Sequence, residues 1–410
     1  NNKKEIIEKV ILVAVADQDT TEAEESLDEL EELVKTAGAE VAARVIQVRE
    51  TPHPGTYIGK GKIDEVNALL YGTNATGIVC DDELSPAQIS NLEEALDTKV
   101  MDRTLIILDI FAKRAFTREG KIQVELAQLK YRASKLTGQG RALSRLGGGI
   151  GTRGPGEKKL EMDRRLIRTR ISRLKAELRD VVKHREVQRK QRQKNHLPVV
   201  CIVGYTNAGK STLLNHFTNA GVYEEDQLFA TLDPTTKSLD LSGGQTILMT
   251  DTVGFIRKLP HHLVEAFKST LEEAKYSDLI LHVVDASNPQ KEKQMEAVYD
   301  TLKQLGANES LIITAFNKID LLNGDEILKD PNAEAVVRIS GKNGEGTDQL
   351  LEQIEKILQK QKLYLEKLYG YQEAGKIQLI RSHGQLLKEE YRDDGIYVEA
   401  YIPKEILGSI

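Results

Sequence analysis

The sequence contains little cysteine and no tryptophan. Only two cysteines occur in 410 residues, and both Cys80 and Cys201 lie inside short apolar runs. We interpret them as small core residues, because buried free cysteines pack like other apolar side chains. The sequence also has no Cys/His cluster with metal-ligand spacing, which argues against a zinc-stabilised or disulfide-linked protein.

Long hydrophobic runs are also missing. Stretches such as Ile11–Ala16 and Leu279–Val284 are far too short to cross a bilayer, and no export signal opens the sequence. Apolar residues make up 40% and charged residues 29% of the chain, as in ordinary core-forming proteins. We therefore expect a cytoplasmic protein with no membrane span, and the length favours about three domains.

Acidic residues outnumber basic ones overall, but one segment is strongly basic. The net charge is −6, whereas Lys158–Lys194 alone carries +10. Such a block is a candidate polyanion-binding surface. Aromatic residues are not interleaved with it, since no Phe, Tyr or Trp lies between Tyr131 and Tyr205. We therefore expect salt-sensitive phosphate contacts with structured RNA rather than stacking on single-stranded bases.

The first hundred residues alternate strand-like and helix-like runs. A Gly/Pro-rich loop, Thr51–Lys62, interrupts them. Ser85-Pro86 is typical of a helix start, with an N-cap followed by proline at the first helical position. The alternation predicts a small α/β domain with a parallel sheet over residues 1–112. Its predicted elements are Ile11–Ala16, Glu22–Lys35, Val41–Val48, Gly77–Cys80 and Ala87–Leu96.

Two long helices are predicted over residues 113–196. The first runs from about Lys121 to Leu146 and the second from about Glu157 to Lys194, with a glycine-rich loop at 147–156. Helices joined by so short a loop should pack as an antiparallel hairpin. The predicted apolar positions are Ile122, Leu126, Leu129, Ala133 and Leu136 on the first helix, and Ile167, Ile171, Leu174, Leu178 and Val181 on the second.

Short β-branched runs separated by helix-length segments return after Pro198. They predict a doubly wound α/β domain over residues 197–365, including a helix at Asp348–Tyr369. The tail, residues 366–410, holds an amphipathic run, Ile377–Tyr391, and an alternating run, Gly395–Pro403, which predict a small α+β appendage. The predicted strands of the larger domain are Val199–Val203, Thr246–Thr250, Leu279–Asp285, Leu311–Phe316 and Val336–Ile339.

A phosphate-binding motif, G-x-x-x-x-G-K-[ST], follows the first of these strands. It stands between a strand and a helix-forming run, which is the context that the motif requires. Its glycines let backbone N–H groups point at phosphates, its lysine reaches the β and γ oxygens, and its serine coordinates Mg²⁺. The residues are Gly204, Tyr205, Thr206, Asn207, Ala208, Gly209, Lys210 and Ser211, followed by Thr212.

Three further motifs follow later strands in the order of a GTPase. Asp251-Thr252-Val253-Gly254 fits D-x-x-G, whose aspartate holds Mg²⁺ through water and whose glycine N–H senses the γ-phosphate. Asn317-Lys318-Ile319-Asp320 fits N-K-x-D, whose carboxylate accepts from guanine N1–H and N2 and would be left unpaired by adenine. Ser340-Gly341-Lys342 offers a backbone N–H to guanine O6. The four motifs predict a P-loop GTPase domain and Mg²⁺-dependent GTP hydrolysis.

Three details stay open on the motifs alone. The switch I hydroxyl that ligates Mg²⁺ can come from Thr231, Thr235 or Thr236. Phe255 stands where Ras-like GTPases carry the glutamine that orients water, so hydrolysis should be slow until another group positions the water. Asn207 either helps to bind K⁺ near the phosphates, as in some GTPases with asparagine there, or binds no ion.

The loop Gly147–Gly156, GGGIGTRGPG, contains a G-x-G-x-x-G match. A dinucleotide-binding role is rejected, because the loop follows a helix rather than a strand. Arg141, Arg145 and Arg153 lie in or beside it. A Gly-Arg tip on a basic hairpin favours RNA contact, and the alternative is a solvated hairpin with charged faces.

Along nearly its whole length the chain resembles HflX, the ribosome-associated GTPases of the Obg–HflX group in the TRAFAC class. The motifs outside the phosphate-binding loop are the more discriminating ones. Lys158-Lys159 depart from the Glu-Thr common in HflX proteins, which we expect to tune charge only. The shared motifs are TYIGKGK at Thr56–Lys62, LSPAQ at Leu84–Gln88, GGGIGTRGPGE at Gly147–Glu157, GYTNAGKST at Gly204–Thr212, FATLDPTT at Phe229–Thr236 and DTVGFIRKLP at Asp251–Pro260.

The resemblance implies Thr231 as the switch I threonine, within Phe229-Ala230-Thr231-Leu232-Asp233, and it agrees with the missing glutamine at Phe255. It further implies a factor that binds GTP or GDP and the rRNA of the large ribosomal subunit, and splits stalled or idle ribosomes in the GTP state. Ribosome binding would then stimulate hydrolysis. A large-subunit assembly checkpoint and a signalling GTPase with protein partners only are the alternatives. We expect a monomer.

Overall fold

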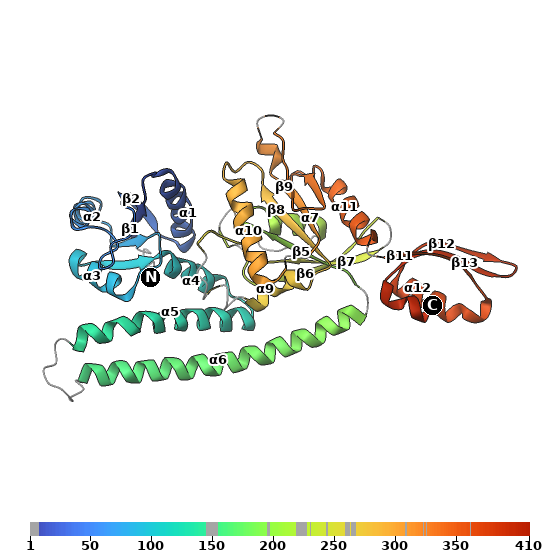
Figure 1. Ribbon diagram of the computed structural model, residues 1–410, viewed down its shortest axis with the longest axis horizontal. Helices are drawn as coiled ribbons and strands as arrows, with labels where there is room; N and C mark the ends of the chain where they lie inside the picture. The colour runs from blue at the N-terminus through green and yellow to red at the C-terminus, as the bar shows by residue number, and fades with distance from the viewer. Residues whose placement is uncertain are drawn as a thin grey trace, which may run out of the picture. The chain divides into compact units, whose positions relative to one another are not determined.

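The structure is a computed structural model that describes residues 8–144, 155–194, 197–218, 228–229, 231–242, 245–258, 263, 268–307, 310–322, 324, 326–360 and 362–410. Figure 1 shows its elements along the chain. Two compact units are present. The first is Asn1–Asp180 with Gln227–Phe229 and Lys258–Phe267, and the second is Val181–Asp226 with Ala230–Arg257 and Lys268–Ile410. No helix among the described residues is both long and apolar enough to cross a membrane.

The N-terminal domain is an α/β domain with a parallel sheet, as predicted. Its strand order is β2-β1-β3-β4. Helices α2 and α3 pack on one face of the sheet, while α1 packs against α4. The prediction missed β4 and α4, and it missed α2 because the helix begins inside the Gly/Pro-rich stretch. The elements are β1 Lys9–Ala16, α1 Thr21–Ala37, β2 Glu40–Val48, α2 Lys60–Thr73, β3 Gly77–Cys80, α3 Pro86–Leu96, β4 Lys99–Asp102 and α4 Arg103–Arg114.

The start of α3 has the capping that its sequence predicts. The Ser85 hydroxyl accepts from the Gln88 N–H at 3.3 Å, and the Gln88 side chain accepts from the Ser85 N–H at 2.8 Å. Pro86 is the first helical residue, where its missing N–H costs nothing. The LSPAQ motif is therefore a reciprocal capping box.

Helices α5, Arg118–Ser144, and α6, Pro155–Lys194, lie side by side in Figure 1. Their contacts run antiparallel: the Arg164 guanidinium donates to the Leu136 carbonyl at 2.7 Å, and Arg170 pairs with Glu125 at 2.7 Å. The predicted hairpin is therefore present. Its apolar cluster joins Ile122, Leu126 and Leu174 with the partly buried Leu129, Ile171 and Leu178.

The following domain is built on a six-stranded sheet of order β10-β9-β8-β5-β7-β6, in which only β6 runs antiparallel. The five parallel strands were predicted. The sixth, β6, was not, because most of its side chains are exposed and show no apolar alternation. The elements are β5 Val199–Gly204, α7 Lys210–Thr218, β6 Thr235–Asp240, β7 Thr246–Asp251, α9 Lys268–Lys275, β8 Leu279–Asp285, α10 Lys291–Leu305, β9 Ile312–Asn317, β10 Ala335–Arg338 and α11 Thr347–Lys360.

The helix predicted at Asp348–Tyr369 is wrong in its last third. The helix α11 ends at Lys360, and Leu363–Tyr369 forms β11, which pairs antiparallel with β13, Gly395–Ile402. Pairing and burial of alternate side chains override the helix propensity of this Leu/Lys/Glu-rich run. The domain boundary expected between residues 365 and 366 falls inside this strand.

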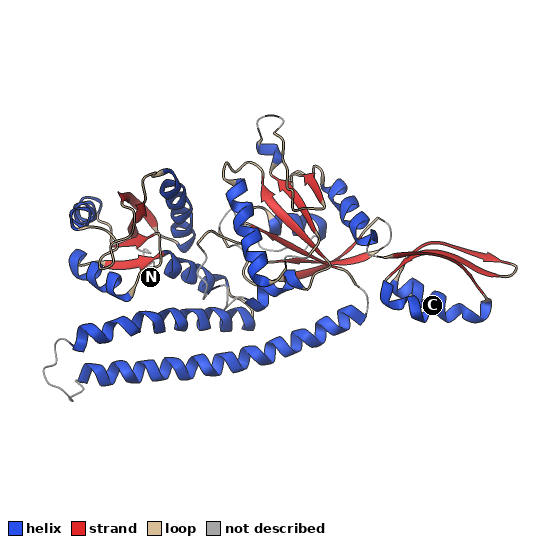
Figure 2. Cartoon of the chain, viewed as in Figure 1, coloured by secondary structure: helices blue, strands red, loops and turns tan. Residues whose placement is uncertain are grey.

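The C-terminal appendage is a three-stranded sheet of order β11-β13-β12. The amphipathic run predicted at Ile377–Tyr391 divides into α12, Ala374–His383, and β12, Gln385–Arg392. The helix α12 packs against β12 and β13 (Figure 2). Alternate β13 residues face it, since Ile396, Val398, Ala400 and Ile402 are buried with Ile377 and Ile380. The tail is thus α+β, as predicted.

Candidate nucleotide site

The phosphate-binding loop leaves the carboxyl end of β5, at the centre of the sheet. The chain places β7 on one side of β5 and β8 on the other, so the loop lies at the point where strand order reverses, which is where such sheets bind ligands. Gly209 has a φ of +91°, and a Cβ there would lie 2.2 Å from Asn317 Nδ2. Glycine is therefore required at this turn.

Lys210 opens α7 and is buried, with 6% of its surface exposed. Its ammonium donates to the Tyr205 carbonyl at 2.9 Å. Burial lowers its pKa to about 8, although Asp251 opposes the shift. A buried ammonium is costly without an anion close by. Such a group fits the β and γ oxygens of a nucleotide.

Three oxygen-bearing side chains converge beside Lys210. Ser211 Oγ donates to Asp251 Oδ2 at 2.7 Å and lies 2.7 Å from Thr231 Oγ1. Among the described residues, the buried Asp251 Oδ1 has no hydrogen-bond partner. Burial raises the pKa of Asp251, while Lys210 lowers it. Hydroxyls and a carboxylate with a free oxygen form a donor set of the kind that Mg²⁺ prefers.

This donor set separates the three switch I candidates. Thr231 lies beside Ser211, whereas Thr235 and Thr236 belong to β6. Thr236 Oγ1 lies instead 2.9 Å from Thr250 Oγ1. Of the three threonines, Thr231 therefore has the geometry for the metal. Around it, Leu232 is buried, Asp233 is half-buried, and Ala230 lies outside the described residues.

The Phe229 side chain is buried, and its predicted place at the nucleotide stays a prediction. It is 1% exposed, with a φ of +56°. Its ring meets that of Phe111 on α4 edge-on, with centroids 4.7 Å apart. The residue groups with the first unit rather than the second. It therefore anchors the start of switch I by an aromatic contact.

The D-x-x-G residues line the same site. A Cβ on Gly254 would lie 2.8 Å from Thr206 Cα and 3.0 Å from Lys210 Nζ, so a larger residue would disturb the phosphate-binding loop. The Thr252 hydroxyl donates to the Ile202 carbonyl at 2.7 Å, and Val253 is buried. These contacts hold the Gly254 backbone beside the lysine.

Phe255 does not take the place of the missing glutamine. Its side chain is 1% exposed. Its N–H donates to the Gly204 carbonyl at 3.1 Å, and its carbonyl accepts from the Thr206 N–H at 2.7 Å. The residue thus pins the start of switch II to the phosphate-binding loop, and its ring has no group that orients water.

The guanine-reading loops are joined through Asn317. Its amide donates to the Ala208 carbonyl at 2.9 Å, and its side-chain oxygen accepts from the Gly341 N–H at 2.8 Å. Lys318 has a φ of +62° and pairs with Asp285 at 2.8 Å. The Asp320 carboxylate is exposed and accepts from the Ser340 hydroxyl at 2.6 Å. These bonds fix the direction of the Asp320 carboxylate, which the sequence predicts to accept from guanine.

The remaining predicted residues divide into two groups. Asn207 and Lys342 are exposed, while Thr212 and Ile319 are half-buried beside the loops that they follow. A K⁺ site at Asn207 stays a prediction. Of the three hairpin arginines, Arg141 belongs to α5, and Arg145 and Arg153 lie outside the described residues.

The motif analysis missed the partners of two loops. The Arg257 N–H donates to the Tyr205 hydroxyl at 2.7 Å, and the next residue, Lys258, pairs with Asp82 at 2.8 Å. Two adjacent aspartates directly after a buried strand, Gly77–Cys80, were the available signal. Ligands of doubly wound sheets bind at the carboxyl ends of the strands.

Three family models match consecutive parts of the chain. Residues 24–112 match the family described as "GTP-binding GTPase N-terminal", residues 114–192 match "GTP-binding GTPase Middle Region", and residues 199–318 match "50S ribosome-binding GTPase". These three matches follow one another along most of the chain.

Curated relatives cover nearly all of the chain. A protein named GTPase HflX from Lacrimispora saccharolytica is 68% identical over 407 residues, which is 99% of this chain and 96% of the relative. GTPase HflX from Escherichia coli is 47% identical over 332 residues, 80% of this chain and 78% of the relative. A GTP-binding protein from Sulfolobus solfataricus, solved with GDP, is 24% identical with a TM-score of 0.45, covering 86% of this chain and 98% of that one.

Proposed function

Because the chain belongs to the HflX family of P-loop GTPases, we propose that it binds the large ribosomal subunit and separates the subunits of stalled or idle ribosomes in its GTP state. The chain hydrolyses GTP, and we assign each of three site residues a separate role. Lys210 offsets phosphate charge, the Gly254 N–H senses the γ-phosphate, and Asp320 reads guanine.

The observation that carries the proposal is the Ser211–Thr231–Asp251 donor set, with its free carboxylate oxygen. Ser211 and Thr231 would hold Mg²⁺ directly and Asp251 through water, and the ion would neutralise phosphate charge. Thr231 belongs to switch I, so its position depends on the nucleotide. A site of this design supports a factor that changes state on hydrolysis.

The ribosomal part of the proposal is supported by the hairpin and the relatives. The helix α6 carries the +10 segment, and a basic rod suits the phosphates of structured RNA. The matched family of the GTPase domain is described as ribosome-binding. We propose that Arg141, Arg145 and Arg153 contact rRNA, and that the protein acts as a cytoplasmic monomer.

Sedimentation of intact ribosomes tests the proposal. With a nonhydrolysable GTP analogue and Mg²⁺, the ribosome peak should separate into subunits. The Lys210→Ala variant should leave the peak intact, because it cannot hold nucleotide. Intact particles with the wild-type protein, under conditions where it is saturated with the analogue, would overturn the splitting role. Binding to immature large subunits without splitting would favour an assembly checkpoint instead.

A charge-neutralised hairpin provides the matched control. Replacing Arg141, Arg145 and Arg153 by Gln should weaken ribosome binding and lower the salt slope by about three units. The control variant replaces three exposed lysines of the GTPase domain, Lys237, Lys303 and Lys356. It should change neither the ribosome affinity nor the salt slope. If both triple variants bind alike, the basic tip does not contact RNA and a protein-only partner is favoured.

A further inference from the structure

The N-terminal domain has a strand end of the kind at which doubly wound sheets bind ligands, and the proposed function does not use it. From β1 the chain forms β2 on one side and then crosses to β3 on the other. Strand order therefore reverses between β1 and β3, and doubly wound sheets bind their ligands at the carboxyl ends of such strands. Asp81 and Asp82 directly follow β3, and the Asp81 N–H donates to the Val13 carbonyl of β1 at 2.9 Å.

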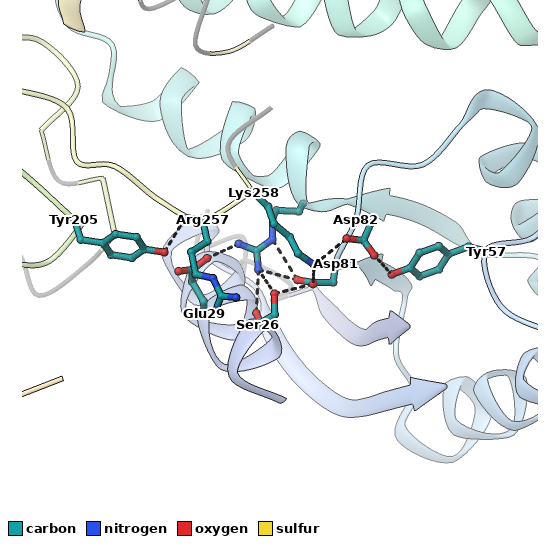
Figure 3. A network of polar contacts seen from close by, with 9 residues as sticks. Ser26, Glu29, Tyr57, Asp81, Asp82, Tyr205, Arg257 and Lys258 are labelled. Atoms are coloured by element: carbon teal, nitrogen blue, oxygen red, sulfur yellow. Dashed lines mark hydrogen bonds and ion pairs between the residues drawn. The ribbon is translucent and has the colours of Figure 1, made fainter. Parts of the chain in front are cut away.

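Cations of the protein itself fill this position. The Arg103 guanidinium is 1% exposed and donates to Asp81 Oδ1 at 2.7 Å. It also pairs with Glu29, and the Ser26 hydroxyl donates to Asp81 Oδ2 at 2.7 Å. The second cation, Lys258, comes from switch II (Figure 3) and belongs to the same compact unit.

Lys258 lies between the two aspartates. Its ammonium donates to Asp81 Oδ2 and, at 2.8 Å, to Asp82 Oδ1. The other oxygen of Asp82 accepts from the Tyr57 hydroxyl at 2.7 Å. Although burial opposes it, the two carboxylates raise the pKa of Lys258. We call this contact, Lys258 with Asp81 and Asp82, the lysine clamp.

The clamp gives a role to two motif residues that had none. Tyr57 belongs to TYIGKGK and Lys258 to DTVGFIRKLP. Both have a left-handed backbone, with φ of +65° and +52°, which L residues adopt only where their surroundings hold them. Tyr57 is 1% exposed, so its hydroxyl has a defined direction.

The clamp is built so that it can open. Without Lys258, the buried Asp81 keeps Arg103 and Ser26 as partners, and no buried charge is left uncompensated. Asp82 and Lys258 have 36% and 40% of their side chains exposed, so water can solvate both after separation.

Lys258 is also close in sequence to the γ-phosphate sensor. Gly254 is four residues earlier, and between them Phe255 and Arg257 are bonded to the phosphate-binding loop through Gly204, Thr206 and Tyr205. The same structure has Thr231 beside Ser211. In this structure, therefore, Lys258 contacts Asp81 and Asp82 while switch I has the arrangement that fits Mg²⁺ and the γ-phosphate.

We propose that Lys258 is a positioning residue for the triphosphate state: its seating between Asp81 and Asp82 holds switch II in the form that binds GTP, and GTP in turn strengthens the clamp. Reciprocity requires both effects to be equal, because they are one coupling free energy. The N-terminal domain then acts as a sensor of nucleotide state. The proposal depends on GTP binding and not on any ribosomal role.

Nucleotide affinities of the full-length protein without ribosomes test the clamp. Lys258→Met should weaken binding of mant-GMPPNP by roughly 5- to 10-fold and leave mant-GDP binding unchanged. Asp82→Asn should act in the same direction. Lys237→Met, at an exposed lysine of β6, should change neither affinity. Equal losses for both nucleotides, or no loss for either, would overturn the proposal.

A charge reversal separates coupling from simple damage to the fold. Lys258→Asp should lose discrimination between the nucleotides, and adding Asp82→Lys should restore at least part of it. Hydrogen exchange provides the reciprocal reading: amides of residues 77–88 should gain protection when the wild-type protein binds GMPPNP, and not in Lys258→Met. Protection that is the same in both proteins would contradict the coupling. Ribosome splitting can fail without affecting any of these outcomes.

Discussion

Asp251 and Asp81 occupy equivalent places in two different sheets. Each comes at the carboxyl end of a parallel strand, Asp251 on β7 and Asp81 after β3, and each is at most 1% exposed. Burial opposes ionisation of both. Among the described residues, however, Asp251 Oδ1 has no partner, and the pKa of Asp251 is raised. Asp81 is saturated by Arg103, Ser26 and Lys258, and its pKa is lowered.

The difference shows how a common fold acquires two functions. A buried carboxylate with an unused oxygen is costly to the protein alone, so it belongs to a site that takes a cation from outside. A buried carboxylate neutralised by the chain's own cations belongs to a site that has become an internal contact. Burial alone does not distinguish the two; the partners of the oxygens do.

The largest effect is expected from replacing Asp251 by Asn. We expect Mg²⁺-dependent GTP hydrolysis to fall by about 1000-fold, because the charge that holds the ion is lost. The melting temperature without nucleotide should stay equal or rise, since an unsatisfied buried charge is removed. Steady-state hydrolysis and thermal melts give both readings. A large loss of stability would mean that Asp251 is a structural residue like Asp81.

Asp81→Asn should have the opposite profile. Removing this charge leaves the buried Arg103 with Glu29 as its one acidic partner among the described residues, and we expect a loss of about 3 kcal/mol in the stability of the N-terminal domain. Hydrogen exchange of the β3 and α1 amides measures it. Asp64→Asn, at an exposed position of α2, should be nearly neutral. Equal exchange in the two variants would contradict the structural role of Asp81.

Asp320→Asn tests a carboxylate that is exposed, unlike those of Asp251 and Asp81. We expect GTP affinity to fall by about 100-fold and xanthosine triphosphate to become the preferred nucleotide, because the amide donates where the carboxylate accepted. Competition titrations against a labelled nucleotide measure both. Asp300→Asn on the exposed face of α10 should keep the guanine preference. An unchanged preference in Asp320→Asn would remove this residue from the base site.

His282 represents a third case, a buried group that stays neutral. It is 1% exposed on β8, 4.0 Å from Asp330, and burial lowers its pKa to about 4. The unfolded chain binds the proton more readily, so the stability that neutral His282 contributes is present above pH 6.5 and is lost as the pH falls toward 4. Between pH 7 and pH 5 we expect a loss on the order of 2 kcal/mol.

Thermal melts at pH 7 and pH 5 measure this smallest effect. His282→Asn has no proton to bind in that window, so its melting temperature should depend less on pH than that of the wild type. Because other groups titrate in both proteins alike, the difference between the two slopes reports His282. Equal slopes would show that protonated His282 is tolerated in the core.

The motifs named the residues of the proposed nucleotide site, whereas parts of the fold had no signal in the sequence. Local motifs identify Lys210, Ser211, Asp251 and Asp320, because phosphate and guanine require particular side chains at a fixed spacing after a strand. Edge strands such as β6 lack that signal, since their exposed side chains carry no apolar alternation. The run Leu363–Tyr369 has a helical composition, and only its pairing with β13 makes it a strand.

The sequence by itself determined that this chain is a GTPase with a basic hairpin, because periodicity and motif spacing are local properties of the chain. The motifs left Thr231, Thr235 and Thr236 open and the resemblance favoured Thr231, which the structure has beside Ser211. Tertiary structure alone decided that Lys258 lies between Asp81 and Asp82. Residues 176 positions apart meet only when two strand ends and a switch loop are brought together by folding. No local pattern encodes such a meeting, since its free energy arises from partners that are distant in the sequence.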